Sequence, residues 1–114
     1  MLDRNAIATA LSSVDGVQGF SYRPSITNPG DGWPLSTVLN RTVGSNYEAL
    51  WKVVVVLPNQ TEQEALTWYD EKFQEIADAL EAEDGYVEQI EPGNLEVEGG
   101  SVKPCMIITY RNEA

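Results

Sequence analysis

The stretch that decides the fold is Tyr47-Glu-Ala-Leu-Trp-Lys-Val-Val-Val-Val-Leu57, which is followed by Pro58. β-Branched residues fit the pleated surface of a sheet, so this run predicts a strand rather than a buried helix. Its first half alternates between apolar and polar residues, and its second half is apolar throughout. A strand with one face in water keeps alternating, so we expect residues 53–57 to be covered on both faces.

A long amphipathic helix is predicted after this strand. Thr61-Glu-Gln-Glu64 is a capping box, in which the Thr61 side chain accepts a hydrogen bond from the Glu64 amide. Apolar residues then recur at helical spacing and predict one core-facing stripe along residues 61–80. They are Leu66, Tyr69, Phe73, Ile76, Ala77 and Leu80. Gly85 is expected to stop the helix.

Shorter elements are predicted on either side. Asp3 predicts the cap of a helix over residues 4–14. Strands are predicted over residues 17–23, 35–43, 86–90, 95–98 and 102–111, with turns at residues 44–46 and 92–94. This order predicts a single domain, residues 1–114, of the α+β class. We expect a two-layer sandwich in which a mainly antiparallel sheet carries the helices on one face.

The charge of the chain excludes some partners. Its 114 residues include 18 acidic and 7 basic side chains, for a net charge of −11. Proteins that grip nucleic acid or anionic membranes cluster Lys and Arg instead. We expect no membrane segment and no signal peptide, because no apolar run is long enough to span a bilayer and the N-terminus lacks the basic and then apolar layout. With a single cysteine, Cys105, the chain is expected in a cytoplasm.

No residue pattern indicates a reaction. The chain has no histidine and no glycine-rich phosphate loop, and Cys105 lies in a strand pattern without a base beside it. We therefore expect no catalytic residues, no cofactor and no metal site, and we do not expect an enzyme. Seven acids near the C-terminal half of the chain are interpreted as a solvated acidic face, because catalytic acids are paired in a pocket. They are Glu81, Glu83, Asp84, Glu88, Glu91, Glu96 and Glu98.

The three tryptophans are candidates for contact with a partner, since Trp is enriched at interface hot spots. Trp33 lies at the tip of a predicted loop over residues 25–34 and either folds back over the core or meets a partner. Trp68 lies roughly 120° from the centre of the apolar stripe, so it is either a flanking residue under a loop or a subunit anchor. Trp51, on the central strand, is more often a core residue than a contact.

Taken together, the order of elements resembles the tail terminator proteins of long-tailed, non-contractile bacteriophages. The resemblance covers the short N-terminal helix, Tyr22-Arg-Pro24, the Pro/Gly/Trp loop, the strand with Trp51, the capped helix, Pro92-Gly93 and the last strand. It implies a structural protein that forms a ring, commonly hexameric, which caps the tail tube, ends its growth and docks the capsid connector. The implied partners are further copies of the chain, the tail tube protein and the connector protein, first in the host cytoplasm and then in the virion.

The resemblance gives the acidity a possible role. DNA would pass through the ring without binding tightly, and a negative lumen made by the seven acids would repel its phosphates. Three other hypotheses stay open. The chain could be another head–tail joining or minor tail protein, a small-molecule-binding or enzymatic α+β domain with a deep apolar pocket, or a nucleic-acid mimic.

Overall fold

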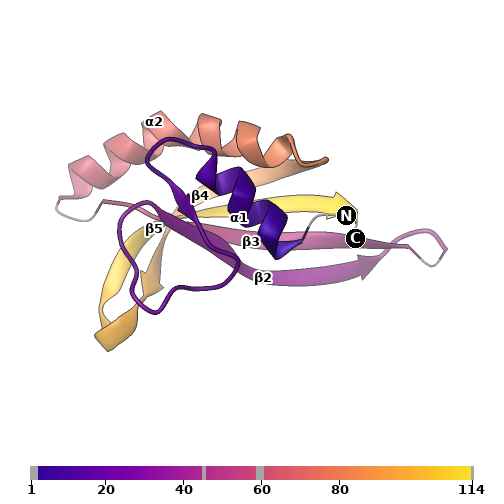
Figure 1. Ribbon diagram of the computed structural model, residues 1–114, viewed down its shortest axis with the longest axis horizontal. Helices are drawn as coiled ribbons and strands as arrows, with labels where there is room; N and C mark the ends of the chain where they lie inside the picture. The colour runs from indigo at the N-terminus through magenta and orange to yellow at the C-terminus, as the bar shows by residue number, and fades with distance from the viewer. Residues whose placement is uncertain (1–2, 45, 59–60, 114) are drawn as a thin grey trace.

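The computed structural model describes residues 3–44, 46–58 and 61–113. Along the chain lie α1 (Arg4–Ser12), β1 (Gln18–Gly19), β2 (Asp31–Arg41), β3 (Tyr47–Val56), α2 (Glu62–Glu81), β4 (Gly85–Glu96), the short 3₁₀ helix η1 (Glu98–Gly100) and β5 (Val102–Glu113) (Figure 1). The strands form one sheet in the order β1-β2-β3-β5-β4. The two-residue pair β1–β2 is parallel and the other pairs are antiparallel.

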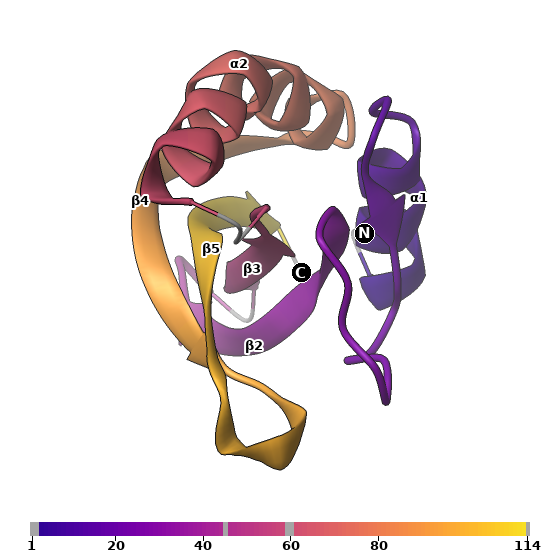
Figure 2. The same ribbon diagram turned by 90° about the vertical axis from the view of Figure 1, so that its left-hand side faces the viewer.

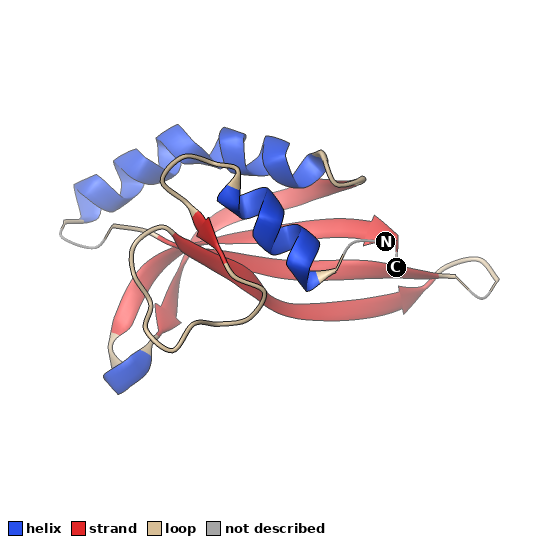
Figure 3. Ribbon diagram, viewed as in Figure 1, coloured by secondary structure: helices blue, strands red, loops and turns tan. Residues whose placement is uncertain are grey.

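Both helices pack on one face of this sheet, as predicted (Figure 3). Viewed nearly end-on, the sheet curves around the side that carries α1 and α2 (Figure 2). The core between the layers joins Ile7 and Leu11 of α1, Ile76 and Leu80 of α2, and the inward side chains of β3 and β5. The fold is therefore an α+β sandwich with a mainly antiparallel sheet.

The central strand is β3, which pairs with β2 on one side and with β5 on the other. Val53 and Val55 belong to the core under the helices, whereas Val54 and Val56 pack with Trp33 on the opposite face. Residues 53–57 are all buried, so the prediction that this run is covered on both faces is confirmed.

Both predicted helix caps are present. The Asp3 carboxylate accepts from the Ala6 amide at 2.8 Å, and the Thr61 hydroxyl accepts from the Glu64 amide at 3.0 Å. At the other end of α2, the buried Tyr110 hydroxyl donates to the Leu80 carbonyl at 2.7 Å. This bond satisfies a carbonyl of the last helical turn and ties α2 to β5.

The predicted turn at residues 92–94 is wrong. β4 continues through Pro92, Gly93 and Asn94, and these residues pair with Met106, Cys105 and Pro104 of β5. The reason is that β4 is an edge strand with one neighbour, where a proline can turn its missing N–H away from the ladder.

The N-terminal strand predictions also need correction. The strand predicted over residues 17–23 is reduced to Gln18–Gly19, and the loop predicted over residues 25–34 already becomes β2 at Asp31. Gly19 lies so close to α1 that an added Cβ would overlap the Ala8 carbonyl, so the chain passes beneath the helix there.

Helix α2 ends at Glu81, and Asp84 rather than Gly85 has the left-handed φ, at 66°.

Candidate functional site

The β2–β3 hairpin projects beyond the part of the sheet that the helices cover (Figure 1). Residues 31–34 of β2 are buried, but residues 35–41 are exposed on both faces of the strand. Five large apolar side chains of the hairpin are exposed, and Val43 at its tip reaches 90%. They are Leu35, Val38, Leu39, Val43 and Tyr47. Grouped apolar exposure of this kind typically marks an interaction surface.

The hairpin tip is held by local hydrogen bonds. The Thr42 amide donates to the Asn46 carbonyl at 2.9 Å, and the Arg41 Nε donates to the Gly44 carbonyl at 3.0 Å. The Arg41 guanidinium also lies 5.7 Å from the centre of the Tyr47 ring. These contacts fix a cation beside apolar side chains, so the hairpin presents a preformed surface. Ser45 of the predicted turn lies outside the described residues.

The outer edge of β2 is open over most of its length. Within the described residues, β1 pairs with Asp31 and Gly32, and the rest of β2 has a neighbour only in β3. Pairing shows that Leu39, Arg41 and Tyr47 share one face of the hairpin, because Leu39 is opposite Ala49 and Arg41 is opposite Tyr47. An open edge flanked by apolar side chains can pair with another chain.

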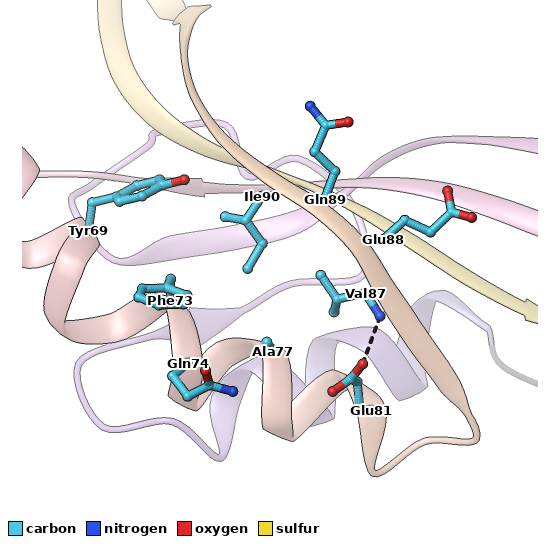
Figure 4. A pocket seen from close by; sticks show the side chains of 9 residues that line it. All are labelled: Tyr69, Phe73, Gln74, Ala77, Glu81, Val87, Glu88, Gln89 and Ile90. Carbon is cyan, nitrogen blue, oxygen red and sulfur yellow. Dashed lines mark hydrogen bonds between the residues drawn. The ribbon is translucent and has the colours of Figure 1, made fainter.

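A groove of about 520 Å³ lies between α2 and β4. Tyr69, Phe73 and Ala77 line it from successive turns of α2, and Val87 and Ile90 line it from β4, with the two sets pointing toward one another (Figure 4). The rings of Tyr69 and Phe73 are stacked with centroids 6.5 Å apart. The groove therefore has an apolar floor that an external apolar group can contact.

The rim of the groove is acidic. Glu81 accepts from the Val87 amide at 3.0 Å, and Glu88 pairs with Arg111 at 2.5 Å. Burial, and then the charges of Asp70 and Glu91, raise the pKa of Tyr69. Among the described residues that line the groove, Glu81 and Glu88 are acidic and none is basic; because Glu88 is paired with Arg111, the negative charge of the rim comes from Glu81. The groove thus has the opposite electrostatic character to the Arg41 hairpin.

Phe73 and Leu66 correct the predicted core stripe of α2. Both are partly exposed, at 39% and 43%, whereas the buried positions of the helix are Ala65, Ile76, Ala77 and Leu80. The contacts of α2 along the sheet are mostly with the edge strand β4, so part of its apolar stripe extends past the sheet. Helical spacing alone could not show this.

The tryptophans are placed differently from one another. Trp33 is 1% exposed and packs with Val54 and Val56, so of the two positions left open for it the one in which it covers the core holds. Trp51 is also buried, and its Nε1 donates to the Asn112 side chain at 3.1 Å. Trp68 is half-buried at the margin of the core, beside a shallow pocket at the start of α2. Its role as a subunit anchor stays a prediction.

The structure does not bring the seven acids onto one face. Glu81, Glu83 and Asp84 lie at the end of α2 and in the following turn, and Glu88 begins an irregular step in β4. Glu91 is opposite Ile107 and Glu96 is opposite Val102, so these two carboxylates point to opposite faces of the sheet. Glu98 instead accepts from the Thr27 amide at 3.1 Å, and this bond lowers the pKa of Glu98.

Other chemical features of the described residues are sparse. Cys105 is buried, and burial raises the pKa of its thiol to about 11. Within the described ranges, no three Cys, Asp or Glu side chains are grouped to hold a metal ion, and neither helix is long and apolar enough to cross a membrane.

Comparisons with known proteins add no identification. No family model, no curated protein and no solved structure matches this chain. The candidate site therefore rests on the hairpin and the groove alone. Sequence reasoning missed the hairpin as a surface, although Val38, Leu39 and Val43 lie together before the glycine of a turn. That clustering was the available signal.

Proposed function

We propose that this chain is a structural assembly protein, the tail terminator of a long-tailed bacteriophage. In this proposal, copies of the chain form a ring, commonly hexameric, that caps the finished tail tube, ends its growth and offers a docking surface to the capsid connector. The proposal rests on the resemblance in element order together with the surfaces of the fold. It assigns no catalytic role to any residue.

The observation that carries the proposal is the exposed β2–β3 hairpin. A monomer gains nothing from a hydrogen-bonded hairpin that holds Val38, Leu39 and Val43 in water. Covering these side chains with another protein removes their apolar surface from water, which stabilises the contact by about 25 cal/mol per Å² before the costs of association. A subunit of an assembly has that cover, so the hairpin favours an assembly function.

The acid-lined passage for DNA stays part of the proposal in a narrower form. Because the seven acids point in several directions, all of them cannot line one lumen. We expect Glu83 and Asp84, in the turn after α2, to be the subset that faces DNA, since they are adjacent in the chain and neither lines the groove. The net charge of −11 opposes tight binding of phosphates in any case.

Electron microscopy of purified tail tubes, with and without the protein, tests the function. The expected result is a ring at one end of each tube and no further elongation, with the solution mass of the protein measured alongside. A protein that attaches to the capsid connector but leaves tubes growing would instead be another head–tail joining component. A compact monomer that ignores both tubes and capsids would overturn the proposal.

The groove between α2 and β4 also bears on the small-molecule hypothesis. Its volume of about 520 Å³ is comparable to that of ligand sites. Its two carboxylates, Glu81 and Glu88, however, lie at the rim and not over the apolar floor of the groove (Figure 4). Polar groups that converge on a bound ligand are the feature this hypothesis requires, so we favour a protein contact at the groove.

A further inference from the structure

The hairpin projects from the molecule and the groove is recessed, and the two surfaces carry opposite charges. The hairpin face that carries Leu39, Arg41 and Tyr47 is apolar with one cation, and residues 35–47 contain no acid. The groove is apolar with an acidic rim and no basic lining residue among those described. Arg41 is therefore a cation on a chain of net charge −11, presented beside apolar side chains that need cover.

The two surfaces belong to different parts of the molecule. The hairpin is the distal end of the β2–β3 pair, whereas the groove is built from α2 and the opposite edge strand, β4. They are separated in the sheet by β3 and β5. A rigid hairpin therefore meets a groove on another copy of the chain rather than its own.

We propose that the β2–β3 hairpin of one copy docks its Leu39–Arg41–Tyr47 face in the α2–β4 groove of the next copy, with Arg41 at the acidic rim. This contact deepens the ring proposal, on which it rests, by naming the two surfaces that join neighbouring subunits. The apolar side chains of the hairpin cover Phe73 and Tyr69, and Arg41 approaches the Glu81 carboxylate at the rim. A contact between two different surfaces is heterologous, so repeating it produces a closed ring or an open filament.

Cysteine cross-linking tests this contact directly. Val43 at the hairpin tip and Gln74 at the groove are both exposed, so Val43→Cys and Gln74→Cys are expected to fold; thermal unfolding checks this. Each is made in a Cys105→Ser background, which removes the native thiol. When the two single variants are mixed and oxidised, with and without tail tubes, we expect disulfide-linked pairs that contain one chain of each.

The outcomes separate the contact from the function. Cross-linking of Val43→Cys with itself would show a tip-to-tip dimer and overturn the proposed contact. Tubes that become capped without any mixed pair would overturn the contact and leave the terminator function standing. If mixed pairs form and the protein assembles into filaments but never caps a tube, the contact is supported and the function is overturned. If tubes are not capped and no mixed pairs form, both the contact and the function are overturned.

A charge variant checks the role of Arg41. Arg41→Glu is expected to weaken association about tenfold, since it places a carboxylate at the acidic rim. The matched control is Arg23→Glu, which changes the net charge equally at an exposed position near β4 and η1. Equal weakening by both variants would show that overall charge, and not docking of Arg41 at the groove, determines the association.

Discussion

One edge of the sheet carries Pro92 and three carboxylates, and the other carries Leu35, Val38 and Leu39. The first edge, β4, also has an irregular step between Val87 and Gln89 and packs against α2. The second edge, β2, has no acid from residue 35 to residue 41 and is exposed there on both faces.

Proteins normally protect open edges with proline, charge and bulges, because unpaired N–H and C=O groups attract other chains. β4 has all three of these protections, with Glu88, Glu91 and Glu96 as its charges. β2 has a proline, Pro34, with an irregularity between Pro34 and Ser36, but it has no proline, charge or irregularity from Ser36 to Asn40. The difference indicates that the chain keeps one edge apart from other molecules and leaves the other available to a partner.

The largest expected effect comes from adding a charge to the open edge. Leu39→Lys places a cation where the proposal needs an apolar contact, so association should weaken by roughly a hundredfold or more. Leu39 is already exposed, so the free energy of unfolding of the monomer should change little. Sedimentation measures the association and denaturant titration measures the unfolding.

The matched control is Asn94→Lys, which adds the same charge to an exposed position on β4 outside the groove. We expect it to leave association unchanged. If both variants weaken association equally, the two edges do not differ in the way proposed.

Local signals were sufficient to predict much of the fold. The apolar run of β3 and the capping box at Thr61 depend on neighbours in sequence, and both elements lie where they were predicted. The continuity of β4 could not be predicted in this way. Pro92-Gly93-Asn94 has the composition of a turn, and only its position at a sheet edge allows a strand to pass through it.

The candidate site was less accessible to sequence reasoning. The exposure of Leu39 depends on where the helices stop covering the sheet. Val38 is paired with Leu50 on the opposite face, so its exposure depends on how far the cluster around Trp33 extends. Both are long-range properties. The groove depends on α2 packing near the edge strand, so that Phe73 of the predicted core stripe becomes partly exposed. Two positions stayed open for Trp33 for the same reason, because only tertiary contacts decide that the end of the predicted loop joins a strand and is buried.

A smaller effect is expected at high pH, on the β4 side of the sheet. Burial, and then the charges of Glu83, Asp84 and Glu81, raise the pKa of Tyr110 to about 12, against about 10 for an unfolded chain. The native state therefore holds this proton more tightly than the unfolded state. Its contribution to stability is complete below pH 10 and is lost as the pH rises through 12, by up to about 1.4 kcal/mol per pH unit.

Denaturant titrations at several pH values, on the wild type and on Tyr110→Phe, measure this contribution. The variant should be less stable near neutral pH by about 0.5–1.5 kcal/mol, because a buried hydrogen bond is lost while the Leu80 carbonyl still accepts from the Glu83 amide at 3.1 Å. Its stability should then fall less steeply between pH 10 and 12. Cys105, whose pKa burial raises to about 11, adds a loss of the same sign from about pH 9, so both proteins carry Cys105→Ala. If the free energy of unfolding falls equally steeply with pH in both proteins, the loss of stability at high pH does not come from Tyr110.

The smallest effect is expected from removing the proline of the protected edge. Pro92→Val adds an N–H to β4, and an exposed position on an edge strand should change the free energy of unfolding by less than about 0.5 kcal/mol. Association of the protein alone should also stay as it is, since Glu88 and Glu91 still repel another acidic chain at this edge. Light scattering over a range of concentrations checks this. Marked self-association of Pro92→Val, absent in Asn94→Lys, would show that the proline rather than the charge protects β4.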